Sequence, residues 1–544
     1  MPDPCKSGFS RDAVGHWSAD ALVRIGVAAC RRFMARAILP AVVLIAPTAF
    51  AQAQVADPIT EDTTWTGRVL VGESVTVAPD ATLTIEPGTV VEFAEDAQLL
   101  VEGALDARGT DDEPITFGRV PGEPDWDHPG QWGGVVAESS RQFALVGCVI
   151  RGATNGVTLR DASAEHSVVD CDIASCSLAG VRIDGGSKAR ITDNRIHDCG
   201  TLWSEDSGDE PTESGGIWLQ DASECQLRDN RIEACSEFGV SLNGADYNAI
   251  GGNTIRGIAG DHMKLHGFGI RGAYSSRNII SANRIEGCAY LLISMGGGCQ
   301  ENLIADNTLR NACDAINFTG YENERNICRN NRISGAGWSQ LYITVGTRGN
   351  RYENCDITDG TGYALTHSSS VETVYEDCEF TGTGPLNVWH WGNCTLRRCK
   401  LIDPVRQYGE YDLKMTHNAQ CTLVDCEGIR RDEVLFEDAN DEHCRVVYKR
   451  AAVVTVVNDE TGEPIHRAVV KAVSGADEVT DATGSDGKVH LELTEGVLRS
   501  SGWEELGAYT LTAQAQGFHA QTVENVTVVE GLATEIRLKA VADE

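Results

Sequence analysis

Residues 170–255 contain four copies of one short motif: DCDI at 170–173, DNRI at 193–196, DNRI at 229–232 and GNTI at 252–255. Related copies lie on both sides: GCVI (147–150), ANRI (282–285), DNTL (306–309), NNRI (330–333), NCDI (354–357), DCEF (377–380), RCKL (398–401) and a degenerate DCEG (425–428). The second position is Asn or Cys in every copy, and neighbouring copies are 21 to 36 residues apart, most often 23 or 24. A period of this length, with few insertions, is typical of a solenoid.

Short alternating stretches between the motif copies indicate which solenoid this is. GVTL, GVRI, GIWL and GVSL begin at Gly156, Gly180, Gly216 and Gly239. Alternation at period two indicates strands with one buried face, and no window has helical periodicity. Leucine-rich repeats have a similar period, but their L-x-x-L-x-L frame is absent. The sequence therefore predicts an all-β fold, a right-handed parallel β-helix with three short strands in each coil.

Two further columns support this register. Five residues before the motif's second position lie Cys225, Asn248, Asn278, Asn302, Asn326 and Asn350. Equivalent side chains stack in a β-helix, so we expect an asparagine ladder that satisfies turn backbone groups. Many of the 19 cysteines fall in the same columns. We expect most of them to be buried thiols, with some neighbouring pairs close enough for a disulfide.

The beginning of the chain looks like a secretory signal. A basic stretch at 31–36 precedes the apolar run 37–46, and Ala49-Phe50-Ala51 forms a small-x-small cleavage site. We expect residues 1–51 to be a signal peptide region, with Met34 as an alternative start, and 52–62 to be a linker. The apolar run is too short to span a bilayer, so we expect no integral membrane segment after signal removal. Export to the secreted, periplasmic or cell-surface compartment of a bacterium follows.

The charge balance excludes some partners. The 544 residues carry 45 Lys and Arg against 80 Asp and Glu, a formal net charge of −35. Nucleic-acid binding needs a basic face, so we expect no nucleic-acid partner, and docking on anionic membranes is also disfavoured. With 42% hydrophobic residues, the chain is not of the disordered class.

Residues 63–118 alternate without the Asn anchor. The run "ATLTIEPGTVVEF…LLVEGALDARGT…PITF", followed by Trp132-Gly133-Gly134, resembles the opening coils of bacterial secreted right-handed β-helix proteins of the pectin-lyase-like kind. The resemblance implies a β-helix over 63–450, with 63–140 as capping coils. It implies no single activity, because that group mixes polysaccharide lyases, hydrolases, epimerases and adhesins.

Residues 451–544 predict a small antiparallel β-sandwich. Gly462-Glu463-Pro464-Ile465, Asp486-Gly487 and Gly517-Phe518 resemble the carboxypeptidase regulatory-like (transthyretin-like) domain, which implies an accessory role and no catalytic residue. The Asp481–Asp486 turn is a possible Ca²⁺ site, but turn aspartates more often cap their own backbone. We expect no other cofactor and no other metal.

Three insertions, 200–215, 257–268 and 403–411, fall at one corner of the coils. The strand face beside the first two presents Arg182, Trp218 and Arg271 outward, so Trp218 is either a sugar platform or packing under the loop. A second aromatic cluster, Trp389 and Trp391, also suggests ligand binding, but its strand frame is ambiguous by one residue.

The same corner also suggests an enzyme. His262, Lys264 or His266 would abstract a proton from a uronic acid while Arg271 neutralises its carboxylate, which is lyase or epimerase chemistry. The alternative is that these three side chains belong to a solvated loop. The N-T-D, D-D, G-H-G and R-I-K motifs of polygalacturonase-type hydrolases are absent in order, so a glycoside hydrolase is the least favoured enzyme.

Two functions therefore stay open. The first is an exported scaffold or binding protein that recognises a polysaccharide or another cell-surface polymer on its lateral face. The second is a polysaccharide lyase or epimerase. The net negative charge counts against an acidic glycan unless Ca²⁺ bridges it or the binding cleft is locally basic. A basic groove with convergent acids would favour the enzyme, and a uniformly acidic face would favour the scaffold.

Overall fold

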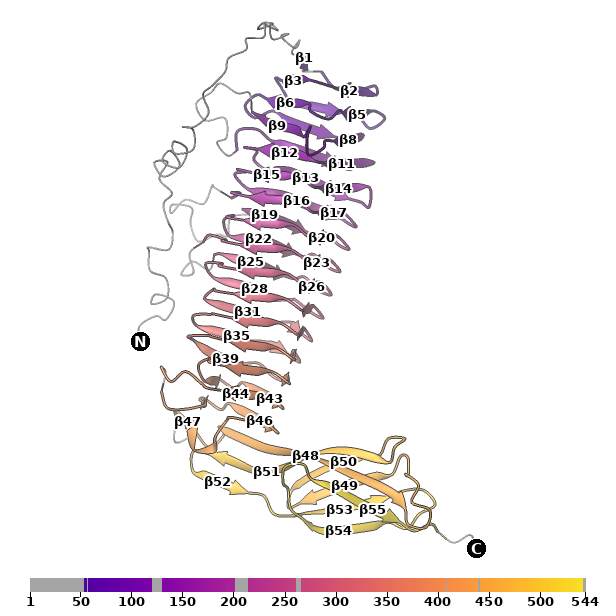
Figure 1. Cartoon of the computed structure of the whole chain (residues 1–544), viewed down its shortest axis with the longest axis vertical. Helices are drawn as coiled ribbons and strands as arrows, with labels where there is room; N and C mark the ends of the chain where they lie inside the picture. Colours follow the sequence, from indigo (N-terminus) through magenta and orange to yellow (C-terminus); the bar gives the residue numbers. More distant parts are fainter. Residues whose placement is uncertain are drawn as a thin grey trace, which may run out of the picture.

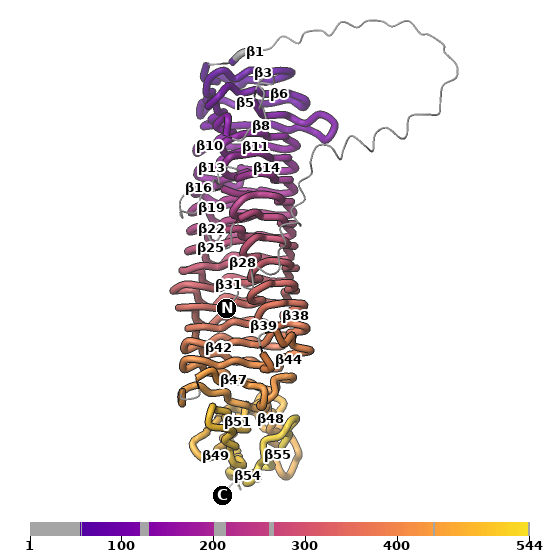
Figure 2. The backbone as a smooth tube through the Cα atoms, turned by 90° about the vertical axis from the view of Figure 1, so that its left-hand side faces the viewer, coloured from indigo at the N-terminus to yellow at the C-terminus, as the bar shows by residue number. Residues whose placement is uncertain are grey.

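The computed structural model describes residues 53–55, 57–119, 130–200, 214–260, 266–407, 409–438 and 441–541. Within them the chain is almost entirely β-structure: three parallel sheets wind into a long solenoid, and a smaller two-sheet domain follows (Figure 1). Viewed from the side, the coils stack evenly along one axis, with the C-terminal domain at the far end (Figure 2). The predicted fold class is confirmed.

Each coil contributes one strand to each sheet because its apolar side chains alternate and turn residues separate the runs. One coil consists of β16 (Ala179–Gly186) in sheet B, β17 (Arg190–Thr192) in sheet C and β18 (Arg195–His197) in sheet A. The inward residues Ile183, Ile191 and Ile196 are fully buried in a core shared with the coils above and below.

Sheet A contains β1 (Ala53–Val55), β3 (Arg68–Val71), β6 (Val90–Phe93), β9 (Ile115–Arg119), β12 (Cys148–Arg151), β15 (Asp172–Ala174), β18, β21 (Arg231–Glu233), β24 (Thr254–Arg256), β27 (Arg284–Glu286), β30 (Thr308–Arg310), β34 (Arg332–Ser334), β38 (Asp356–Thr358), β41 (Glu379–Thr381) and β44 (Lys400–Ile402).

Sheet B contains β4 (Val75–Val77), β7 (Gln98–Val101), β10 (Gly134–Glu138), β13 (Val157–Ala162), β16, β19 (Gly215–Gln220), β22 (Phe238–Asn243), β25 (Phe268–Ala273), β28 (Leu291–Met295), β31 (Asp314–Phe318), β35 (Ser339–Ile343), β39 (Tyr363–Ser368), β42 (Leu386–Trp389), β45 (Leu413–Met415) and β47 (Val434–Phe436).

Sheet C contains β2 (Thr63–Trp65), β5 (Thr82–Ile85), β8 (Ala104–Arg108), β11 (Gln142–Val146), β14 (His166–Val169), β17, β20 (Gln226–Arg228), β23 (Ala249–Gly251), β26 (Ile279–Ser281), β29 (Leu303–Ala305), β33 (Ile327–Arg329), β37 (Arg351–Glu353), β40 (Thr373–Glu376), β43 (Asn393–Arg397) and β46 (Gln420–Val424). The short strands β32 (Asn323–Glu324) and β36 (Thr347–Arg348) pair with each other, and η5 (Arg431–Glu433) is a single 3₁₀ turn.

Two asparagine ladders stabilise the turns on either side of sheet C, as the sequence predicts. In each ladder an Asn Oδ1 accepts hydrogen bonds from the backbone N and Nδ2 of the Asn one coil earlier, at 2.8–3.1 Å. The first ladder comprises Asn194, Asn230, Asn253, Asn283, Asn307 and Asn331, and the second Asn248, Asn278, Asn302, Asn326 and Asn350. All are buried, so the ladders satisfy polar groups that the coils remove from water.

The cysteine prediction is confirmed for most positions. Among the described cysteines, 16 are free thiols, and all of these except the part-buried Cys426 are buried. Burial raises the pKa of the Cys288 thiol to about 12, which keeps it protonated and unreactive at neutral pH. Cys313 is disulfide-bonded.

The two ends differ in detail from the expected boundaries. β1 pairs in parallel with β3, so sheet A already begins inside the predicted linker 52–62. The signal peptide region predicted at 1–51 lies outside the described residues. No membrane-spanning helix is found in the part of the chain that the structure describes.

The strand β48 (Arg445–Asn458) crosses the expected domain boundary at 450/451. Its first half pairs with β46 of sheet C, and its second half belongs to the C-terminal sandwich. One sandwich sheet combines β48 with β51 (Lys488–Arg499), β52 (Gly502–Glu505) and β55 (Ala533–Leu538). The other contains β49 (Val469–Ser474), β50 (Asp477–Ala482), β53 (Tyr509–Gln514) and β54 (Gln521–Val526). β48 and β55 run parallel, a departure from the purely antiparallel expectation.

Candidate functional site

The outer face of sheet A carries a row of arginines over its middle coils. From β12 to β34 the outward positions hold seven arginines against three carboxylates, in a chain whose net charge is −35. The arginines are Arg151, Arg195, Arg231, Arg256, Arg284, Arg310 and Arg332, and the carboxylates are Asp172, Glu233 and Glu286. All these arginines except Arg151 are exposed. We call these outward positions the arginine face.

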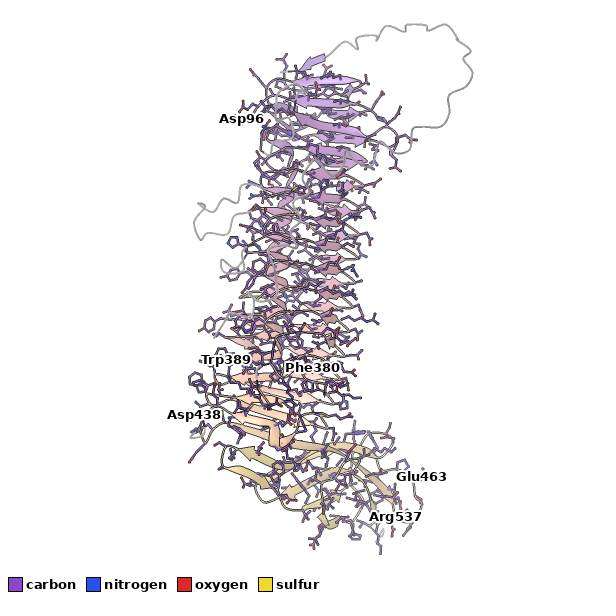
Figure 3. The ribbon with its side chains drawn as sticks, turned by 60° about the vertical axis from the view of Figure 1, so that its left-hand side comes forward. Asp96, Phe380, Trp389, Asp438, Glu463 and Arg537 are labelled. Atoms are coloured by element: carbon purple, nitrogen blue, oxygen red, sulfur yellow. The ribbon has the colours of Figure 1, made fainter. Side chains whose placement is uncertain are left out.

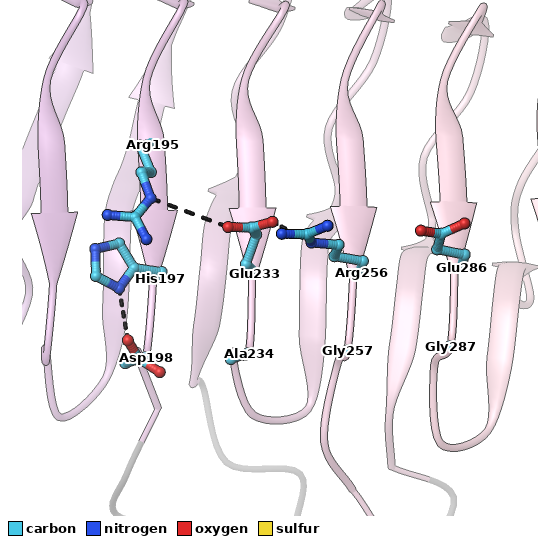
Figure 4. Close-up of a pocket in the computed structure, with 9 residues that line it drawn as sticks. All are labelled: Arg195, His197, Asp198, Glu233, Ala234, Arg256, Gly257, Glu286 and Gly287. Carbon is cyan, nitrogen blue, oxygen red and sulfur yellow. Dashed lines mark hydrogen bonds and ion pairs between the residues drawn. The ribbon is translucent and has the colours of Figure 1, made fainter. Parts of the chain in front are cut away.

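An open depression of about 540 Å³ lies at the end of the arginine face, where the chain turns toward sheet B (Figure 4). Glu233 is at its centre, 2.7 Å from Arg231 and 4.0 Å from Arg195, and it also pairs with Arg256. Burial alone would raise the pKa of Glu233, but hydrogen bonds from Arg231 and Arg256 lower it below its ordinary value. Glu233 therefore stays ionised and holds the guanidinium groups in place.

His197 lies at the edge of this depression. Its Nε2 is 3.0 Å from Asp172 and its Nδ1 is 2.5 Å from Asp198. Hydrogen bonds to Asp172 and Asp198 raise the pKa of His197 to about 9. Burial opposes ionisation of Asp172, but hydrogen bonds from His197 and Arg151 lower its pKa to about 2. At neutral pH His197 is a fixed cation and a poor proton acceptor, so it suits anion binding better than base catalysis.

The structure places Arg182 and Trp218 together on the outer face of sheet B. Trp218 points outward, as predicted, but its side chain is only 5% exposed, so of the two alternatives the structure favours packing over a solvent-facing sugar platform. It packs against Ala179 and Phe238, and the Arg182 guanidinium lies 4.0 Å from its ring centroid. Because the ring face is already covered, Trp218 offers no open stacking surface in this conformation.

Arg271 and His266 each have partners among the described residues. Arg271 donates a hydrogen bond from Nε to Ser241 Oγ at 2.9 Å, and its guanidinium lies 4.6 Å from the Phe238 ring centroid. His266 is 6% exposed, and its Nδ1 lies 3.1 Å from Glu237 Oε1, so it is not part of a solvated loop. His262 and Lys264 lie outside the described residues. Their catalytic role therefore stays a prediction.

The second aromatic cluster lies near the C-terminal end of the solenoid (Figure 3). Trp389 ends β42 and is part-buried beside His390, whose ring centroid is 4.3 Å away. Trp391 follows in the turn, with φ +59° and 64% exposure. The frame that the sequence left ambiguous is therefore resolved: Trp389 points outward from sheet B, in register with Ser368.

The arginine face was not among the sites predicted from the sequence. Its signal is present in the repeated motif, where Arg195, Arg231, Arg284 and Arg332 directly follow the anchoring asparagines in N-R-I. The anchor turns inward, so the next residue must point outward. Reading the motif for its charged column, as well as for its anchor, would have found the face.

The described side chains add no evidence for a metal site. Among the described residues, no group of three or more His, Cys, Asp and Glu side chains is arranged to hold a metal ion. In the turn predicted as a possible Ca²⁺ site, Asp481 Oδ1 accepts from Ala482 N at 2.8 Å and Asp486 Oδ1 from Lys488 N at 3.1 Å. Ca²⁺ binding there stays an untested prediction.

Comparison with known proteins places the solenoid among similar folds. A family model described as "Right handed beta helix region" matches residues 133–267, 210–337 and 262–401. No curated protein matches the chain.

Solved structures with similar coils include three proteins. The Dettilon tailspike protein (gp208) is 12% identical, with 81% of this chain and 74% of that chain covered and a TM-score of 0.29. The alginate lyase from Paenibacillus sp. str. FPU-7 is 15% identical, with 63% and 89% covered and a TM-score of 0.23. The periplasmic alginate epimerase AlgG is 13% identical, with 68% and 74% covered and a TM-score of 0.23. At these identities and scores the similarities say nothing of this chain's activity.

The family match and the three parallel sheets lead to the same conclusion about the fold. The chain is an all-β protein whose solenoid is a right-handed parallel β-helix, continued by a small β-sandwich.

Proposed function

We propose that this chain is an exported, non-catalytic protein that binds an acidic polysaccharide along the arginine face of its β-helix. The observation that carries the proposal is the excess of arginine on this one face of a strongly acidic chain. Arginine forks hold carboxylate and sulfate groups through paired, charge-assisted hydrogen bonds. The surrounding negative charge would direct a polyanion to this face and away from the rest of the surface.

The spacing of the face also suits a polymer. Successive coils repeat every 4.8 Å or so, which presents a regular row of cations along the solenoid axis. Arg310 and Arg332 form no ion pair with any described residue, so they are available to a ligand without breaking an existing contact. Arg231 and Arg256, by contrast, are held by Glu233 and would add a preformed site at one end of the row.

The test reverses two of the available charges. We expect Arg310→Glu/Arg332→Glu to weaken retention by alginate and polygalacturonate in affinity electrophoresis by about tenfold. The matched control is Arg190→Glu/Arg228→Glu, which makes the same charge change at exposed outward positions of sheet C. The control should retain near-normal binding.

Three outcomes would reject the proposal. Equal losses in both double variants would show a general charge effect rather than a binding face. Absence of retention by any acidic polysaccharide, with binding to DNA instead, would identify a different polyanion. Rising absorbance at 235 nm during incubation with either polysaccharide would show β-elimination and favour the lyase alternative with His262, Lys264, His266 and Arg271.

A further inference from the structure

A column of outward residues on sheet B contains three buried side-chain oxygens without a hydrogen-bond partner among the described residues. Asn317 of β31, Tyr342 of β35, Thr366 of β39 and Asn387 of β42 are in register on four consecutive coils. Asn317 Oδ1, Thr366 Oγ1 and Asn387 Oδ1 have no hydrogen-bond partner among the described residues. The three side chains are 3%, 3% and 9% exposed. We call these four residues the acceptor column.

Formation of the β-helix does not require these oxygen atoms to be left without hydrogen-bond partners. A buried polar atom without a partner costs about 1–3 kcal/mol, so several in one column are a substantial and localised penalty. Elsewhere on the same sheet an outward polar residue is paired, as Ser241 Oγ is with Arg271 Nε at 2.9 Å. Polar atoms left without partners in a folded protein point to a role that the free structure does not fulfil.

Aromatic side chains accompany the column. Tyr342 lies between Asn317 and Thr366, and its ring centroid is 5.5 Å from that of Trp338. Trp389 follows Asn387 by two residues on β42, and its Nε1 also has no hydrogen-bond partner within the part of the chain that the structure describes. Burial, with the nearby Asp314 carboxyl, raises the pKa of Tyr342, so its phenol keeps its proton. The site therefore combines hydrogen-bonding atoms with ring faces that suit the C–H face of a sugar.

The chemistry of the column selects an uncharged ligand. Amide and hydroxyl oxygens without donors are completed by O–H groups. Strands β31, β35, β39 and β42 contain no Lys or Arg, and Lys414, which lies beside Asn387 on β45, is already paired with Glu437 at 3.0 Å. The Asp314 carboxyl at the start of β31 is buried, and its Oδ2 likewise has no hydrogen-bond partner in the described ranges. A hydroxyl-rich neutral sugar fits these groups, and an acidic one does not.

We propose that the acceptor column, together with Trp389, is a second binding site, for an uncharged segment of polysaccharide. It is separate in sheet, residues and charge preference from the arginine face, so it does not rest on the function proposed above. Binding requires the Tyr342 ring to turn aside, because strands about 4.8 Å apart place its side chain against both Asn317 and Thr366.

Thr366→Val tests the site with the smallest change of shape. The variant removes an unpartnered hydroxyl, so in the free protein we expect an unchanged or higher melting temperature. Retention by neutral soluble polysaccharides (dextran, laminarin and galactomannan, in affinity electrophoresis) should fall at least fivefold for whichever of them binds the wild-type chain. Asn387→Leu should act in the same direction.

Thr358→Val is the matched control, an outward threonine on sheet A of the adjoining coil. It should change neither readout, and Arg310→Glu/Arg332→Glu should leave neutral-polysaccharide retention intact. Retention of none of the three polysaccharides by the wild-type chain would overturn the proposal, as would unchanged retention by Thr366→Val. A clear fall in the melting temperature of Thr366→Val would also overturn it, because the hydroxyl would then have a partner inside the protein.

Discussion

Asparagine occurs in two kinds of buried position in this molecule, and they are satisfied very differently. Asn278 in the second ladder accepts from Asn248 N at 2.8 Å and Asn248 Nδ2 at 3.1 Å, and it donates to Ala245 O at 2.9 Å. Asn317 on the outer face of sheet B is also buried, yet its Oδ1 has no partner among the described residues. The same side chain is a structural element in one place and an incomplete site in the other.

The backbone explains the difference. At the turns beside sheet C the chain bends, and the asparagine side chains reach backbone groups that no strand partner satisfies. On the flat outer face of sheet B the backbone groups are already paired between coils, so an amide there depends on other side chains or on a ligand. Stacked asparagines in the turns therefore contribute to stability, whereas those on the flat face need a functional explanation.

The largest expected effect is the loss of a ladder member. Asn278→Leu removes the acceptor for Asn248 and the donors to Ala245 O and Asn302 Oδ1. Several buried groups lose their partners at once, so we expect destabilisation of about 3–5 kcal/mol in urea unfolding followed by circular dichroism. A decrease in the free energy of unfolding below about 1 kcal/mol would mean that the groups in the turn find other hydrogen-bond partners. The conclusion that the ladder asparagines stabilise the fold would then be wrong.

We expect a smaller change in the free energy of unfolding when a side chain of the arginine face is altered. There the side chains pair through charge rather than through stacked amides. His197 has a pKa raised to about 9, so its contribution is complete below its unfolded pKa of about 6.5 and is lost as the pH rises through 9. Asp172 has a pKa lowered to about 2, so its contribution is complete above about 4 and is lost as the pH falls toward 2. The pair stabilises the fold most between these limits, near pH 4 to 6.5.

His197→Gln isolates the alkaline limb of this dependence. We expect it to cost about 1–2 kcal/mol at pH 6 and to reduce the fall in stability between pH 6.5 and 9, measured by urea unfolding at each pH. Asn278→Leu, which carries no titrating group, should leave the shape of the pH profile unchanged. An alkaline limb that persists in His197→Gln would assign the titration to another residue.

The fold could be predicted almost completely from the sequence, because the features that determine it repeat from coil to coil. The motif, the asparagine column and the thiol column each mark one position in every coil. An uncertain assignment in one coil can therefore be checked against the equivalent positions of its neighbours. The site was predicted less well for a physical reason. Alternation shows that Trp218 points outward, but it does not show that Arg182, 36 residues earlier, covers the ring. That contact depends on which side chains meet between coils.

Hydrogen-bond pairing on the outer face of sheet B was even harder to predict from the sequence. Asn194 and Asn317 are both buried in the coils, and only the three-dimensional neighbours show that one oxygen is paired and the other is not. The arginine face is intermediate in how well it can be predicted from the sequence. Its residues follow the repeat, and its direction follows from the inward anchor, so it was predictable in principle from N-R-I alone.

The smallest expected effect is also the one that most sharpens the comparison between the two asparagines. Asn317→Leu makes the same exchange as Asn278→Leu at a position that is also buried, but it removes an oxygen that has no hydrogen-bond partner among the described residues. The cost of burying that oxygen disappears, so we expect stability to be unchanged or to rise by up to about 1 kcal/mol in urea unfolding. Destabilisation equal to that of Asn278→Leu would show that Asn317 has a structural partner, and the distinction between the turn ladder and the acceptor column would fail. An opposite sign in the two variants would show that one residue type holds the solenoid together in its turns and is kept on its face at a cost to stability.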